Sequence, residues 1–94
     1  MRELIIEKYL IKEVKAVGGM CIKLGGYVGI PDRMVILPNN IILFVELKTP
    51  IGRLTPLQQR WKSWLEKMGC IHLVIRDQLA VNKLIVEYFE KEKQ

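Results

Sequence analysis

The stretch GIPDRMVILPNNIILFVELK, residues 29–48, determines how the rest of the chain is arranged. Two runs rich in Val, Ile, Leu and Phe, at 33–37 and 41–47, flank the turn-forming sequence Pro38-Asn39-Asn40. Apolar runs of strand length separated by such a turn are typical of a β-hairpin. The hairpin supplies two neighbouring strands, so we expect the segments before and after it to extend the same sheet or cover its faces.

Three polar side chains stand where a buried hairpin would not normally hold them. Asp32 follows Pro31 just before the first strand, and Glu46 and Lys48 lie near the end of the second. Because side chains alternate between the faces of a strand, Glu46 and Lys48 emerge on one face and Leu47 on the other. A carboxylate on an apolar strand carries a desolvation cost that a bound metal ion would offset. The alternative is a surface salt bridge at a strand end.

These residue types suit the hydrolysis of a phosphodiester. Carboxylates from two strands can hold Mg²⁺ or Mn²⁺, with Asp32 as the central ligand, Glu46 as the second and the backbone carbonyl of Leu47 as the third. Such an ion lowers the pKa of a bound water and polarises a phosphoryl oxygen. Lys48 can orient that water or stabilise the developing negative charge. A glutamate of the first helix could complete the site, and Gln58 could position the lysine, the water or the phosphate.

Length and composition limit the class of protein. A chain of 94 residues, half of them hydrophobic, predicts one folded domain over residues 1–94 rather than a disordered chain. No apolar run approaches the ~20 residues of a transmembrane helix, and nothing resembles a signal peptide, so we expect a cytoplasmic protein without a membrane partner. The net charge of +5 is compatible with a polyanionic partner. Two distant cysteines and one histidine exclude a Cys/His zinc site.

Hydrophobic periodicity, bounded by glycine and proline, predicts the elements outside the hairpin. They are helices at 2–17, 56–68 and 78–91 and strands at 20–24 and 70–76. The order is therefore α-β-β-β-α-β-α. It predicts an α/β fold in which helices flank a mixed sheet and a crossover connection runs through the second helix.

Two further segments allow more than one interpretation. The helix at 56–68 carries an apolar stripe that includes Trp61 and Trp64, and such tryptophans are more often core residues than DNA-stacking groups. We therefore expect them in the core. The glycine-rich loop at 25–29 lacks a phosphate-binding fingerprint, and a flexible loop that lets a large ligand approach the backbone is an equally good interpretation.

The motifs GIPDR and FVELKTPIGRLTPLQQRW together resemble the VRR-NUC (virus-type replication-repair nuclease) domain of the PD-(D/E)xK nuclease superfamily. The resemblance covers nearly the whole chain and puts Asp32, Glu46 and Lys48 at the motif positions. It implies a restriction-endonuclease-like fold, Mg²⁺- or Mn²⁺-dependent cleavage of DNA, and a role in phage or mobile-element DNA processing in a bacterial host. Stand-alone members are similar to Holliday-junction resolvases, which implies a homodimer acting on four-way junctions.

The resemblance also points to two residues whose assignment stays open. The helical glutamine of the family matches Gln58 or Gln59, with Gln58 favoured. The glutamate of the first helix matches Glu7 or Glu3. Glu7 is favoured because it stands 11 residues before the glycine pair that ends this helix.

Basic side chains near the loops that flank the site are expected to contact DNA phosphates. They are Lys23, Arg33, Arg53, Arg60 and Lys62. Such contacts make binding salt-dependent and largely independent of sequence. Two alternatives to a junction-cleaving dimer are a flap or nicking nuclease on replication or repair intermediates, and a nuclease-derived module that binds DNA without cleaving it.

Overall fold

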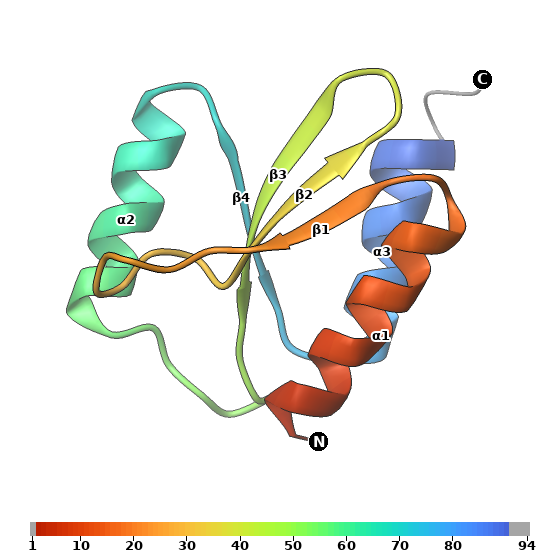
Figure 1. The fold of residues 1–94 in the computed structure, drawn as a ribbon. Helices are drawn as coiled ribbons and strands as arrows, with labels where there is room; N and C mark the ends of the chain where they lie inside the picture. Colours follow the sequence, from red (N-terminus) through yellow and green to blue (C-terminus); the bar gives the residue numbers. More distant parts are fainter. Residues whose placement is uncertain (1, 91–94) are drawn as a thin grey trace.

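The hairpin predicted from the sequence forms the centre of the fold. The computed structural model describes residues 2–90 (Figure 1). Its elements are α1 (Glu3–Ala16), β1 (Met20–Lys23), β2 (Arg33–Leu37), β3 (Ile41–Leu47), α2 (Pro56–Lys67), β4 (Ile71–Ile75), α3 (Gln78–Ile85) and the π-helix η1 (Val86–Glu90). The predicted order α-β-β-β-α-β-α is confirmed, although the predicted end of the last helix at residue 91 lies outside the described residues. No helix within residues 2–90 could span a membrane.

The four strands lie in the order β1-β2-β3-β4. The pairs β1–β2 and β2–β3 are antiparallel, and β3–β4 is parallel. A tight turn joins β2 to β3 at Asn39 and Asn40, whose φ angles of 68° and 66° are ones that asparagine tolerates. Parallel neighbours cannot be joined by a tight turn, and α2 provides the crossover between β3 and β4. The predicted mixed sheet and its crossover are therefore confirmed.

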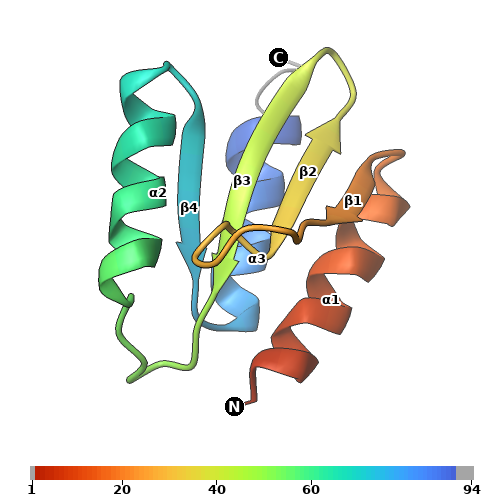
Figure 2. The ribbon, with the colours of Figure 1, turned by 60° about the vertical axis from the view of Figure 1, so that its left-hand side comes forward.

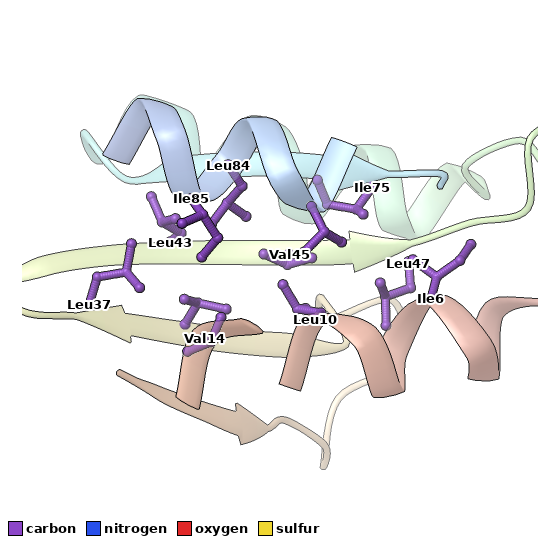
Figure 3. Close-up of a cluster of buried hydrophobic side chains, with 12 residues drawn as sticks. Ile6, Leu10, Val14, Leu37, Leu43, Val45, Leu47, Ile75, Leu84 and Ile85 are labelled. Carbon is purple, nitrogen blue, oxygen red and sulfur yellow. The ribbon is translucent and has the colours of Figure 1, made fainter. Parts of the chain in front are cut away.

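Helices cover the two faces of the sheet unequally. α1 and α3 lie together on one face, and α2 lies alone on the other (Figures 1 and 2). The main core forms between the sheet and the α1–α3 pair (Figure 3). It consists of aliphatic side chains: Ile6, Leu10, Val14, Val35, Leu37, Leu43, Val45, Leu47, Ile75, Val81, Leu84 and Ile85. On β2 and β3 these are alternate residues, so the residues between them, including Glu46, face α2.

The α2 layer is thinner than the sequence predicts. Leu65 is the only buried residue of α2, and Trp64 is 45% exposed. The expectation that both tryptophans lie in the core is wrong for Trp64, while Trp61 is half-buried. The reason is that α2 packs against β4, at one edge of the sheet, and leaves the β2–β3 half of this face open. An apolar hollow of about 440 Å³, whose lining includes Met34 and Phe44, occupies part of the open half.

Candidate active site

Asp32 and Glu46 face each other across the open end of the hairpin. The β2–β3 register pairs Arg33 with Val45, so the next residue on each strand brings Asp32 opposite Glu46. The backbone N–H of Leu47 donates a hydrogen bond of 2.7 Å to Oδ2 of Asp32. Asp32 is therefore held by the same strand that carries Glu46, and the two carboxylates form one unit.

Glu46 is buried, with 2% of its surface exposed. The pKa of Glu46 is raised to about 8, first by burial and then by the neighbouring carboxyl of Asp32 and the negative charge of Glu3, while Lys48 opposes the rise. Oε2 accepts a long hydrogen bond of 3.4 Å from Nε2 of Gln58. Oε1 is buried without a partner among residues 2–90. A buried carboxylate with an unsatisfied oxygen is costly unless something positive binds there.

The start of α2 positions Gln58. The side chain of Thr55 accepts from the backbone N–H of Gln58 at 3.1 Å, and Oε1 of Gln58 accepts from the backbone N–H of Thr55 at 2.9 Å. This capping box holds one end of the amide, so its Nε2 points toward Glu46. Gln59 instead donates to the carbonyl of Leu54. Of the two glutamines left open by the sequence, Gln58 is the one that contacts the acidic pair.

The two candidate glutamates of α1 have different surroundings. Oε2 of Glu7, the residue favoured from the sequence, accepts from Nε of Arg33 at 2.8 Å, and both side chains are largely buried. Arg33 shares the face of Val45, its neighbour in the register, which is the face that α1 covers rather than the face of Glu46. The charge of Glu3, by contrast, acts on Glu46. Glu7 is therefore engaged with Arg33, and the charge of Glu3 contributes to the raised pKa of Glu46.

The same ion pair engages Arg33, one of the predicted phosphate contacts, within the chain. Its guanidinium also donates through Nη1 to the backbone carbonyl of Cys21, so part of its hydrogen-bonding capacity is used within the chain. Lys62 pairs with Glu66 at 3.2 Å along α2. The side chains of the remaining three candidates are exposed and make no hydrogen bond or ion pair within the described chain. They are Lys23, Arg53 and Arg60.

The loop after Lys48 depends on a residue that the sequence analysis did not identify. Nη1 of Arg76 donates to the carbonyls of Thr49 and Gly52, and the backbone N–H of Lys48 donates to the carbonyl of Ile75 at 3.0 Å. The end of β4 thus holds the loop that follows the lysine. The sequence signal for this residue is its position: Arg76 directly follows β4, the strand that runs parallel to the Glu-x-Lys strand β3.

Known proteins share this fold. A solved structure described as "VRR_NUC domain" superposes with a TM-score of 0.86 and 36% sequence identity, covering 93% of this chain and 97% of that chain. "Putative nuclease p44" of Acyrthosiphon pisum secondary endosymbiont phage 1 is 46% identical over 77 residues, which cover 80% of this chain and 81% of that protein. No family model matches the chain.

The mixed sheet and these two similarities define the class of protein, a nuclease domain with a PD-(D/E)xK-like fold. The chain belongs to the VRR-NUC family.

Proposed function

We propose that the protein is a divalent-metal-dependent endodeoxyribonuclease that cleaves branched DNA as a homodimer. The observation that carries the proposal is the buried carboxylate of Glu46 beside Asp32, with one oxygen unpartnered among the described residues. Two adjacent acids, one of them buried, favour the binding of a hard cation, because Lys48 offsets only part of their repulsion and a cation relieves the rest.

The donors near the acidic pair fit Mg²⁺ or Mn²⁺. Asp32, Glu46 and the backbone carbonyl of Leu47 would hold the ion, and all three are oxygen donors, as these cations prefer. Within residues 2–90 no group of three or more His, Cys, Asp or Glu side chains forms a complete metal site, so water would supply the other ligands. Glu3 replaces Glu7 in the proposal, as a residue that would act on the ion through its charge. When bound, the ion would activate water and polarise the phosphoryl oxygen.

The protein's own groups have separate roles in this reaction. Lys48 shares the face of Glu46 and would stabilise negative charge on the phosphate or orient the attacking water. Gln58 would keep the Glu46 carboxylate in place through its side-chain hydrogen bond. Asp32 would keep its position through the backbone of Leu47. The roles of Gln58 and Asp32 use contacts within this chain, and all three roles can be tested by substitution.

Basic side chains and a second copy of the chain would bind the DNA. Lys23, Arg53 and Arg60 are exposed and would contact phosphates without reading base sequence. A four-way junction must be cut on two strands, and a dimer presents two sites to them. A 46%-identical phage protein bearing the name of a nuclease supports a setting in phage DNA processing in the bacterial cytoplasm.

The test is cleavage of a labelled four-way junction, with linear duplex, single strands and a flap as comparisons, in Mg²⁺ and in Mn²⁺. Asp32→Ala and Lys48→Ala serve as inactive variants. Paired cuts across the junction, lost in both variants, would support the proposal. Cuts in flaps or single strands alone would retain the chemistry and contradict a junction-cleaving dimer. DNA binding without metal-dependent cleavage would instead favour a non-catalytic DNA-binding module.

A further inference from the structure

The loop between β1 and β2 crosses from the far edge of the sheet to α2 (Figure 1). Nε1 of Trp61 donates to the carbonyl of Val28 at 3.2 Å. Gly29 sits so close to α2 that an added Cβ would lie 2.7 Å from Cβ of Leu57, and its φ of +86° also favours glycine. These contacts attach the Val28–Gly29 end of the loop to the helix.

Three aromatic rings gather where the loop meets α2, and we call them the aromatic cluster: Tyr27, Trp61 and Trp64. The ring centroids of Tyr27 and Trp61 are 5.8 Å apart, and those of Trp61 and Trp64 are 5.6 Å apart. Yet Tyr27 is 69% exposed and Trp64 is 45% exposed. The rings therefore pack against one another while part of the aromatic surface of Tyr27 and Trp64 stays open to solvent.

The aromatic cluster lies beside the candidate active site. Gln58, which contacts Glu46, is three residues before Trp61 on α2, a rise of about 4.5 Å along the helix. On the other side, the backbone N–H of Leu24 donates to the carbonyl of Asp32 at 3.0 Å and closes the base of the loop that carries Tyr27. A DNA strand with a phosphate at the acidic pair would thus have its next bases within reach of the cluster.

We infer that the aromatic cluster is a stacking surface for a base exposed at the branch point of the DNA substrate, an inference that rests on the proposed function. In continuous duplex both faces of every base pair are covered by neighbours, whereas a branch exposes base faces that aromatic side chains can cover. The neighbouring Arg60 is exposed and basic, which suits a nucleic-acid strand better than an apolar protein surface. This contact would give the nuclease a preference for branched over linear DNA.

The experiment measures the binding of two DNAs without divalent metal, a four-way junction with one unpaired base at the branch and a linear duplex of equal length. Tyr27→Ala should weaken junction binding roughly tenfold, the loss typical of one aromatic–base contact, and leave duplex binding unchanged. Tyr27→Phe keeps the ring and should bind as the unmodified protein does. Leu79→Ala is the matched control, because Leu79 is 61% exposed on α3, on the other face of the sheet.

Three outcomes would overturn the inference. Tyr27→Ala could bind the junction normally, could lose affinity equally for both DNAs, or could change the molecular mass in solution, which would assign the cluster to a contact between copies. Cleavage of the same DNAs in Mg²⁺ separates this failure from that of the proposed function. If Tyr27→Ala still cleaves and has the preference for junctions, only the inference fails. If the unmodified protein cleaves neither DNA, the proposed function fails as well.

Discussion

At the scale of single residues, the site depends on side chains that do two things at once. The Gln58 amide closes the capping box of α2 through one atom and contacts Glu46 through the other. Asp32 contributes a carboxylate to the candidate site and accepts a hydrogen bond from the backbone N–H of Leu47 at the end of β3. Sequence spacing identified both residues, but only the geometry separates Gln58 from Gln59.

Two substitutions separate the structural part of Gln58 from its part in the site. Thr55→Ala removes the cap and should lower the free energy of unfolding by about 1 kcal/mol, with cleavage retained. Gln58→Ala removes the other half of the capping box, the hydrogen bond from the backbone N–H of Thr55, and also the contact with Glu46, so it should lower stability by a similar amount and slow cleavage in addition. Urea unfolding and single-turnover cleavage measure the two effects. Equal cleavage by both variants would mean that Gln58 serves the helix alone.

Metal binding can be tested without measuring cleavage. Mg²⁺ that binds the folded state should raise the midpoint of thermal unfolding; at 100 times its dissociation constant, the gain is about 2.7 kcal/mol. Asp32→Asn should abolish this gain because it removes a charged ligand. Asp77→Asn is the matched control, since Asp77 caps α3 and asparagine caps nearly as well. A midpoint that rises with Mg²⁺ in Asp32→Asn as it does in the control would exclude this aspartate as a ligand.

At the scale of elements, the rotation of each helix about its axis relative to the sheet determines which charged side chains lie close together. Glu3 and Glu7 are one turn apart on α1, yet Glu7 pairs with Arg33 while Glu3 influences Glu46. The distance from a glycine pair, which favours Glu7, carries no information about which way the helix faces. Proximity in sequence predicts Arg33 as a DNA contact, whereas alternation along β2 turns its side chain to the α1 face.

The contact between α2 and β4 predicts a pH dependence of stability. His72 on β4 is 7% exposed, and its Nδ1 has no partner among residues 2–90. Burial lowers its pKa and the charge of Lys62 adds to this, while Glu66 opposes it; the strand partner Phe44 carries no charge. Because the unfolded chain takes up a proton near pH 6.5 and the folded protein resists it, this contribution to stability is present above pH ~6.5 and is lost as the pH falls below it.

His72→Gln tests this dependence, since glutamine does not titrate. As the pH is lowered from about one unit above 6.5 to about one unit below it, the free energy of unfolding of the unmodified protein should fall relative to that of the variant. The comparison between the two proteins cancels the opposite contribution of Glu46, whose raised pKa favours folding at lower pH. Parallel pH profiles of the two proteins would contradict the role assigned to His72.

At the scale of the whole molecule, the exposed charges predict how DNA binding responds to salt. Arg53 follows the loop that Arg76 holds and is exposed without a partner in the described chain. Arg53→Ala should weaken junction binding at low salt and reduce the slope of log affinity against log salt by about 1, because one fewer counterion is released. Stabilisation by Mg²⁺ should be unchanged. An unaltered salt slope would remove Arg53 from the DNA-binding surface.

The sequence by itself determined the elements, their order and the three motif positions of the candidate site. These follow from local information: hydrophobic period, turn residues, and alternation along one hairpin that carries Asp32, Glu46 and Lys48. The boundaries of α1 and α2 and the start of α3 agree with the predicted ones to within one residue for the same reason.

Only the tertiary structure decided which distant side chains join the acidic pair. Choosing Gln58 over Gln59 and distinguishing Glu3 from Glu7 require the rotation of a helix about its own axis relative to the sheet, which no local pattern contains. The placement of Trp61 and Trp64 depends on how much of the sheet α2 covers, which is set by its packing on the edge strand β4. An apolar stripe indicates which face of a helix can be buried, but the tertiary packing determines how much sheet surface that face covers.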